Sequence, residues 1–267
     1  MYTHFWGLAE SPFQNVPDPR FFFPSRSHRE GLMRLLYLVE GGKGAGMLTG
    51  EIGCGKTTLA RSFVRGLPAS KYEVGVITNP SLPRIEFLKE VNLQLGIPTG
   101  HDSNKGDLLR HLNDGLLGNF RRGKRTVLLV DEAHIIEESQ ILEELRLLLN
   151  FQLNDRFLLT LVLVGQPELV ERIAAVKPLD QRIEVRHHLS HLGLNETMTY
   201  ILFRLRKAGS SRAIFSEEAL KAIHEITRGL PRLINVLCDL CLLEGSLGKV
   251  KLVDSAIVKK VAEDLRS

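Results

Sequence analysis

The stretch that decides the fold is Met47-Leu48-Thr49-Gly50-Glu51-Ile52-Gly53-Cys54-Gly55-Lys56-Thr57-Thr58. An apolar run leads into it, and helix-forming residues follow it. The positions of Gly50, Gly55 and Lys56 fit the pattern G-x-x-x-x-G-K-[ST], in which a glycine loop joins a β-strand to an α-helix. A chance glycine turn is the alternative, but it does not explain why lysine and threonine both fall in register.

This P-loop pattern has a defined chemistry. Glycines let the loop fold back so that successive backbone N–H groups point at phosphate oxygens, and the helix N-terminus adds positive charge. Lys56 supplies a cation for the outer phosphates, and the Thr57 hydroxyl is placed to ligate Mg²⁺. The predicted phosphate-binding residues are Gly50, Glu51, Ile52, Gly53, Cys54, Gly55, Lys56, Thr57 and Thr58.

The composition is that of an ordinary globular protein. The chain has 267 residues, 43% hydrophobic and 25% charged, which allows one large domain or two small ones. The net charge of +4 permits contact with nucleic acid or acidic lipid but does not require it, because acids are nearly as numerous as bases.

We expect a cytoplasmic protein. No stretch approaches the 18 or so unbroken apolar residues of a membrane span. The first residues lack the cationic and apolar segments of a secretory signal, and three cysteines suit a reducing compartment.

The chain divides into three predicted segments, residues 1–44, 45–190 and 191–267. The first holds an aromatic and proline-rich stretch, expected to run extended, and an amphipathic helix that begins near Ser25. Residues Pro24 to His28 are candidates to line the pocket for the adenine base, with His28 as a binding residue. Simple anchoring of these side chains in the core is the alternative.

A second chemical motif lies at residues 126–134, where an apolar strand ends in Asp131-Glu132-Ala133-His134. Sheets of α/β proteins place ligands at the carboxyl ends of their strands. Asp131 is therefore predicted to hold the Mg²⁺ shell, and Glu132 to orient or deprotonate the water that attacks the terminal phosphate.

Two further polar residues follow apolar strands. Residues 157–164 form a predicted strand that ends before Gln166, whose amide is placed to report on the terminal phosphate or the water. A turn-forming glutamine before proline is the alternative. Arg182 precedes a short strand and is a candidate to reach the nucleotide of a neighbouring subunit, because its planar fork suits phosphate.

A basic turn, Arg121-Arg122-Gly123-Lys124-Arg125, precedes the Asp131 strand. Such a run usually forms a solvated edge, and contact with nucleic acid or lipid is the alternative.

The remainder of the chain is predicted to be helical, over residues 195–208, 216–228, 231–245 and 254–266. Cys238 and Cys241 share a helix face with leucines. Because no further ligands lie nearby, buried core thiols are favoured over a metal site.

Together these motifs resemble the AAA+ ATPases, and more narrowly those of the general secretion pathway A type (ExeA-like), which include relatives in type IV pilus biogenesis. The matching stretches cover nearly the whole chain: Phe5–Leu8, Pro12-Phe13, Pro17–Phe22, Ser25–His28, Gly50–Thr58, Val130–His134, Gly165–Leu169, Gln181–Ile183, Gly229–Arg232 and Leu237–Asp239.

The resemblance implies a three-layer αβα core with a central parallel sheet of about five strands, followed by an all-helical lid. It implies that Gln166 is the first sensor, Arg182 the trans-acting arginine and Arg232 the second sensor. Asn79 resembles the polar residue that holds the catalytic glutamate inactive until a partner binds.

The implied activity is hydrolysis of ATP with Mg²⁺ in a homo-oligomer whose assembly depends on ATP. A membrane-anchored protein of a secretion or pilus system is the candidate partner. Many members continue into a membrane span and a periplasmic cell-wall-binding domain, whereas this chain ends at Ser267. It resembles either a short member or the cytoplasmic part of a longer one.

Two alternatives stay open at this point. One is a DNA-binding regulator ATPase of the transposition target-selection type, suggested by the basic charge and the turn at residues 121–125. The other is a nucleotide-gated interaction switch with slow turnover.

Overall fold

A computed structural model describes residues 2–16, 18–100 and 102–265, and the chain folds into two compact units. The sheet unit comprises Ser27–Glu51 and Leu59–Leu189. The helical unit comprises Met1–Arg26, Ile52–Thr58 and Ser190–Ser267.

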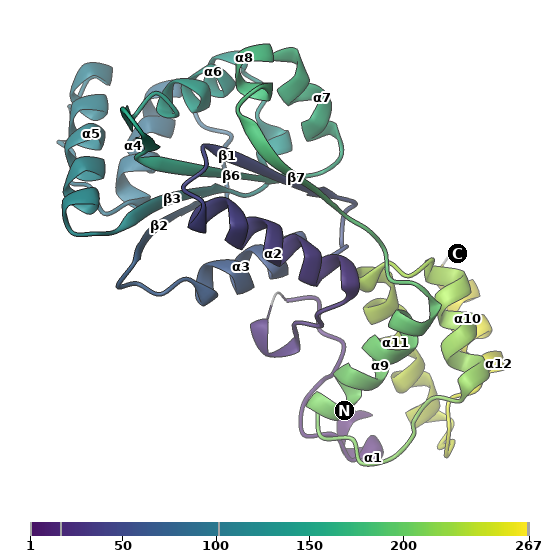
Figure 1. Cartoon of the computed structure of the whole chain (residues 1–267). Coiled ribbons are helices and arrows are strands. Elements are labelled where there is room, and N and C mark those ends of the chain that lie inside the picture. Colours follow the sequence, from purple (N-terminus) through teal and green to yellow (C-terminus); the bar gives the residue numbers. More distant parts are fainter. Residues whose placement is uncertain (1, 17, 101, 266–267) are drawn as a thin grey trace. The chain divides into compact units, whose positions relative to one another are not determined.

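The sheet unit contains a five-stranded parallel sheet in the order β2-β3-β6-β1-β7 (Figure 1). The bounds are β1 (Ala45–Gly50), β2 (Tyr72–Ile77), β3 (Arg125–Val130), β6 (Leu159–Gly165) and β7 (Ile183–Leu189). Strands β1 and β6 are buried along their whole length, as expected for strands covered on both faces. A separate hairpin pairs β4 (Gln152–Leu153) with β5 (Arg156–Phe157).

Helices cover both faces of this sheet. Figure 1 shows α2 (Arg26–Glu40) and α3 (Lys56–Gly66) on one face. The opposite face carries α4 (Arg84–Gln94), α5 (Lys105–Arg121), α6 (Ser139–Leu148), α7 (Glu168–Ala175) and α8 (Lys177–Asp180). A 3₁₀ turn, η2 (Ala133–Ile135), follows β3. This arrangement confirms the predicted αβα core with five parallel strands.

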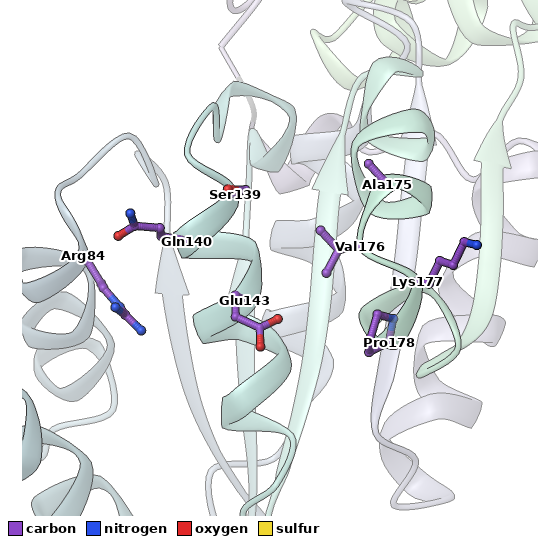
Figure 2. Close-up of a pocket in the computed structure, with 8 residues that line it drawn as sticks. All are labelled: Arg84, Ser139, Gln140, Glu143, Ala175, Val176, Lys177 and Pro178. Atoms are coloured by element: carbon purple, nitrogen blue, oxygen red, sulfur yellow. The ribbon is translucent and has the colours of Figure 1, made fainter.

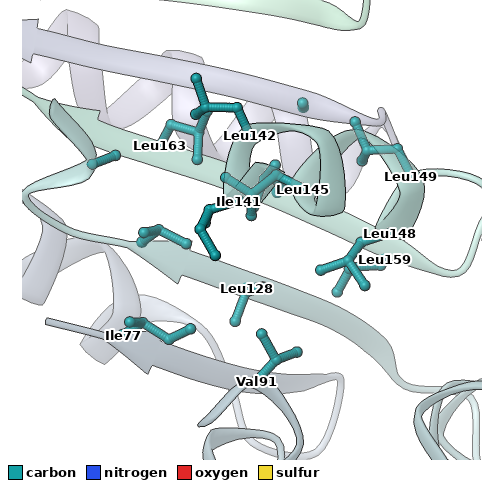
Figure 3. Close-up of a cluster of buried hydrophobic side chains, with 14 of the residues drawn as sticks. Ile77, Val91, Leu128, Ile141, Leu142, Leu145, Leu148, Leu149, Leu159 and Leu163 are labelled. Atoms are coloured by element: carbon teal, nitrogen blue, oxygen red, sulfur yellow. The ribbon is translucent and has the colours of Figure 1, made fainter. Parts of the chain in front are cut away.

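An aliphatic core fills the space between the sheet and α4, α5 and α6 (Figure 3). Leu128 and Leu163 project from neighbouring strands toward Val91 of α4 and Leu145 of α6, and all four side chains are buried. Burial of this apolar surface is the main force that holds the face closed.

One charged group lies inside this helical layer. Glu144 of α6 is fully buried, and its Oε1 accepts from Arg84 of α4 and from Lys105 Nζ of α5 at 2.6 Å. The carboxylate therefore ties together three helices that the sheet alone does not fix. Glu144 itself is fully buried, whereas Arg84 and Lys105 are 37% and 32% exposed, so the two ion pairs are what offsets the burial of the carboxylate.

We expect Glu144→Gln to lower the free energy of unfolding of the sheet unit by about 3 kcal/mol, measured by urea denaturation followed by circular dichroism. Its neighbour Glu143 provides a matched control, because that carboxylate is 43% exposed and pairs with Arg146 on the surface. Glu143→Gln should cost less than about 1 kcal/mol. Equal losses in the two variants would contradict the proposed role of Glu144.

The helical unit is built from five helices within the described residues. They are α1 (Tyr2–Trp6), α9 (Leu194–Lys207), α10 (Glu217–Thr227), α11 (Pro231–Leu247) and α12 (Ser255–Asp264). Ser216 and Asp254 accept backbone N–H groups at the starts of α10 and α12. The four helices predicted after residue 195 are confirmed; α1 was not expected.

The N-terminal segment packs with these C-terminal helices in one core. The Trp6 indole N–H donates to the Leu242 carbonyl at 2.8 Å, and Phe13 packs edge-to-face against Phe215. A turn of 3₁₀ helix, η1 (Pro19–Phe21), lies farther along the segment.

A buried arginine fixes the path of this segment. The Arg204 guanidinium donates to the Pro12 and Gln14 carbonyls at 2.6 and 2.9 Å and to the Tyr200 hydroxyl at 2.9 Å. It also lies over the Phe21 ring at 4.6 Å, a cation–π geometry. A charge that is only 6% exposed thus finds partners on a segment almost 200 positions away.

Among the described residues, no helix combines the length and apolar character that a bilayer crossing requires.

Candidate nucleotide-binding site

Parallel pairing brings the ends of three strands to one edge of the sheet. Strand β6 lies between β1 and β3. Its register pairs Gly165 with Thr49 of β1 and Leu163 with Val130 of β3. The strands that precede the glycine loop, Asp131 and Gln166 in the sequence therefore all end at this carboxyl edge, where α/β proteins bind ligands.

The two predicted acids lie directly after β3. Asp131 is 5% exposed; its backbone N–H donates to Ile77 O at 2.8 Å, and its Oδ1 accepts from the Glu132 backbone N–H at 2.9 Å. Glu132 adopts a left-handed backbone, with φ of 53°, immediately before η2. Non-glycine residues rarely adopt this conformation, and its cost of about 1–3 kcal/mol is typical of functional turns.

The turn also places His134 between Glu132 and Gln166. His134 Nε2 lies 2.6 Å from Gln166 Nε2, and His134 Nδ1 lies 3.4 Å from Glu132 Oε2. The imidazole is 12% exposed, whereas the Glu132 side chain is 43% exposed. His134 thus contacts Gln166 on one side and lies beside Glu132 on the other, although no sequence pattern assigned it a role.

The glycine loop has the backbone that its sequence predicts. Gly53 and Gly55 have φ values of 81° and 103°, which suit glycine alone. Lys56 is 6% exposed at the start of α3, and Cys54 is fully buried. Gly50 ends β1, and Glu51, Ile52, Thr57 and Thr58 complete the loop and the first turn of α3.

The loop also contacts helix α11 within the helical unit. The Arg232 backbone N–H donates to Gly53 O at 3.2 Å, and a Cβ placed on Gly53 would lie 2.4 Å from the Arg232 Cβ. The predicted second sensor and the phosphate loop are therefore in direct contact, and only glycine fits at position 53.

Three other predicted residues also belong to the sheet unit, and one of them, Asn79, follows β2, whose last residue Ile77 pairs with Val130 of β3 at the same carboxyl edge. Arg182 donates to the Arg146 carbonyl at 3.2 Å and to Asn150 Oδ1 at 2.8 Å, at the C-terminal end of α6. Asn79 Oδ1 accepts from the Ser81 backbone N–H at 3.3 Å, and among the described residues no hydrogen bond joins Asn79 to Glu132. His28 is buried in the first turn of α2.

The first turn of α2 packs against β7. His187 Nε2 lies 2.9 Å from Ser27 O, and a Cβ on Gly31 would lie 2.8 Å from the ring. Partial burial lowers the pKa of His187 despite this hydrogen bond, so the ring favours its neutral form.

The basic turn at residues 121–125 is largely engaged in contacts within the sheet unit. Arg125 donates to the Val39 and Glu40 carbonyls, Lys124 pairs with Glu73 at 2.9 Å, and Arg122 donates to Asn119. These contacts hold α2, α5 and the amino ends of β2 and β3 together. Most of the cations in this turn are therefore paired within the sheet unit. This favours the expected solvated edge over a surface that binds nucleic acid or lipid.

The acids and hydroxyl of the site suit magnesium better than a protein-bound transition metal. No cluster of three or more His, Cys, Asp or Glu side chains able to hold a metal occurs in the described part of the chain. Mg²⁺ is held by one or two protein oxygens together with substrate phosphates and water. In the sheet unit, Asp131 is a nearly buried carboxylate at the carboxyl edge that meets the requirement for such a protein oxygen. Cys238 and Cys241 are free and buried, and burial raises the pKa of Cys241 to about 12.

A separate groove lies between α6 and the α7–α8 connection (Figure 2). Its volume is about 690 Å³, and Arg84, Ser139, Glu143, Lys177 and Pro178 are among the residues that line it. None of the predicted nucleotide-binding residues lines this groove.

Comparison with known proteins decides the family. A model of the AAA domain matches residues 39–173, a range that contains the glycine loop, Asp131, Glu132 and Gln166. The chain belongs to the AAA ATPase family. Within this family it is of the general secretion pathway A type: it is 40% identical over 261 residues to general secretion pathway protein A of Aeromonas hydrophila. That match covers 96% of this chain, which spans 47% of the length of the relative.

Solved structures show the same AAA fold at low sequence identity. The ORC2 protein of Aeropyrum pernix, in its ADPNP–ADP complexes, has a TM-score of 0.71 at 17% identity, covering 94% of this chain and 71% of that one. The ORC1 protein of the same organism, in complex with DNA, gives 0.68 at 16%, covering 96% and 69%. A RuvB mutant of Thermotoga maritima gives 0.58 at 20%, covering 89% and 69%.

We expect Gly53→Ala to weaken nucleotide binding, because the left-handed backbone and the contact with Arg232 leave no room for a methyl group. Strain of about 1–3 kcal/mol corresponds to a rise in Kd of about 5- to 150-fold, measured by titration with a fluorescent ATP analogue. Gly118→Ala is the control, since a Cβ there meets no atom within 4 Å. Unchanged affinity in Gly53→Ala would contradict this account of the loop.

Proposed function

We propose that this protein is a magnesium-dependent ATPase that assembles through ATP-dependent subunit contacts and acts in the assembly of secretion or type IV pilus machinery. The observation that carries the ATPase part is the carboxyl edge of the sheet: Gln166 follows β6, which pairs with the strand of the glycine loop, and Asp131 and Glu132 follow β3, which pairs with the other side of β6.

The residues have distinct roles in this proposal. The backbone of residues 50–58 and Lys56 bind the phosphates, and Thr57 and Asp131 hold the magnesium, which would neutralise charge on the terminal phosphates. Glu132 orients or deprotonates the attacking water, because its carboxylate is the more exposed of the two acids. Gln166 senses the terminal phosphate, and Arg232 contributes a cation from α11.

Arg182 is the residue proposed to act between subunits. Its guanidinium is held by a carbonyl and an amide at the end of α6 and has no carboxylate partner among the described residues. A cation presented in this way has charge left to interact with the phosphates of a neighbouring subunit. Oligomerisation would then depend on ATP.

The secretion role rests on the general secretion pathway A relative, whose remaining length lies outside the match. A membrane-anchored partner of such a system, which would recruit the protein to the inner membrane from the cytoplasm, is part of the same proposal.

We expect Glu132→Gln to lower kcat for ATP hydrolysis by about 100-fold or more, the usual contribution of a general base. The variant should still bind ATP and should accumulate the assembled form in size-exclusion chromatography with light scattering. Wild-type protein that hydrolyses no ATP with magnesium, even when assembled, would contradict the proposal.

We expect Arg182→Ala to abolish most ATPase activity at concentrations where the wild type assembles, because the neighbouring site loses its stabilising cation; a loss of about 1,000-fold is typical of such an arginine. Arg186→Ala is the matched control, since Arg186 is an exposed arginine nearby that pairs with Asp180. Normal hydrolysis by Arg182→Ala would exclude a role between subunits.

A DNA-binding AAA regulator is the second candidate, favoured by the net charge of +4 and by the exposed Arg121 of the basic turn. Its electrostatic support is reduced because Arg122, Lys124 and Arg125 make contacts within the sheet unit. A gel shift with ATP at about 50 mM salt distinguishes the candidates, because electrostatic DNA binding is strongest at low salt.

A further inference from the structure

We propose that His134 is a positioning residue that couples Gln166, the sensor of the terminal phosphate, to the carboxylate of Glu132. This inference rests on the proposed ATPase function and adds a residue to it. Four observations carry it: two short distances, one buried nitrogen without a hydrogen bond, and one glycine.

The direction of the contacts follows from the chemistry of the two side chains. With the amide nitrogen of Gln166 placed 2.6 Å from His134 Nε2, the amide can only donate, so Nε2 must accept. A neutral imidazole that accepts at Nε2 carries its hydrogen on Nδ1. The glutamine therefore selects the tautomer whose N–H faces Glu132.

The opposite orientation of the amide would be unfavourable. With the Gln166 oxygen in contact, Nε2 would donate, and the lone pair of Nδ1 would face the carboxylate oxygen of Glu132 at 3.4 Å. Two acceptors would then face each other beside a half-exposed carboxylate. Electrostatics therefore favours the arrangement in which Gln166 donates, His134 relays and Glu132 accepts.

The Nδ1 end of this chain is incomplete. Nδ1 is buried and makes no hydrogen bond, although Glu132 Oε2 lies 3.4 Å away. A buried donor without a partner costs about 1–3 kcal/mol, and a small rotation of the Glu132 side chain removes that cost. The carboxylate is thus drawn toward His134, and its orientation depends on how the imidazole is held.

The backbone is built for this contact. A Cβ on Gly165 would lie 3.1 Å from the His134 backbone nitrogen, so glycine at the end of β6 permits the close approach of η2. The left-handed conformation of Glu132 turns the chain so that residues 132 and 134 flank the same space. Asn79, the residue predicted to restrain the glutamate, accepts from the Ser81 backbone N–H in its own loop.

The functional consequence is a coupling between substrate and base. When Gln166 donates to a terminal phosphate, it no longer donates to His134 Nε2. The imidazole is then free to change its orientation or tautomer, and its interaction with the Glu132 carboxylate changes as a result. His134 itself touches neither water nor phosphate in this scheme. A purely structural role, in which the imidazole only fills space beside η2, is the alternative that the experiment must separate.

The experiment measures kcat and KM for ATP together with urea unfolding, for the wild type, His134→Ala, Gln166→Ala and the double variant. We expect His134→Ala to lower kcat by about 10- to 100-fold, as misplacement of a catalytic group does, with KM for ATP changed less than about threefold. The double variant should be no slower than the worse single variant, because residues that act as a unit are not additive.

Two conservative variants identify which end of the imidazole matters. Asparagine places an N–H near the position of Nδ1, so His134→Asn should recover part of kcat, whereas His134→Gln, which places an amide near Nε2, should not. These variants also test the proposal if His134→Ala fails to fold. His191→Ala is the matched control, because His191 is exposed.

The outcomes separate the two proposals. Wild type without ATPase activity overturns the proposed function. If the wild type is active and His134→Ala changes kcat by less than about twofold, the coupling alone is overturned. The coupling is also overturned if the fold-losses in kcat of His134→Ala and Gln166→Ala multiply in the double variant. If kcat falls across the His134 variants only in proportion to their loss of folding stability, His134 has a structural role and the coupling is likewise overturned.

Discussion

Parallel hydrogen bonding between β1, β6 and β3 is the constraint on which the candidate site depends. Strands that run in one direction end at one edge, and the register of β6 with both neighbours fixes how far apart their last residues lie. Polar residues from three separate stretches of sequence therefore reach a common edge. A sheet with one of these strands reversed would place that strand's polar residues at the opposite edge.

Two buried charges show how each unit is held together beyond its apolar core. Glu144 joins α4, α5 and α6 in the sheet unit, and Arg204 joins the N-terminal segment to α9 in the helical unit. Buried charges stabilise a fold only when several well-placed partners replace water. Both groups have such partners, and in both cases the partners lie on different elements. They therefore specify which elements pack together as well as how tightly.

The polar turns at the carboxyl edge have the opposite character. Glu132 has a strained backbone and a half-exposed side chain, and His134 has a buried nitrogen without a hydrogen bond. Unsatisfied polar atoms and rare backbone conformations gather where side chains must change partners during a reaction. The turn after β3 combines one of each within three residues.

By itself the sequence determined the α/β class, the phosphate loop, the acids at 131 and 132 and the four C-terminal helices. These features are local: glycine spacing, apolar runs and helix caps act within a few residues. Only the tertiary structure decided that His134 contacts Gln166, that Glu144 is buried, that the basic turn is engaged in internal contacts and that the N-terminal segment packs with the C-terminal helices. Each of these depends on strand pairing or helix packing between distant stretches, and no local pattern encodes which distant group a polar side chain meets.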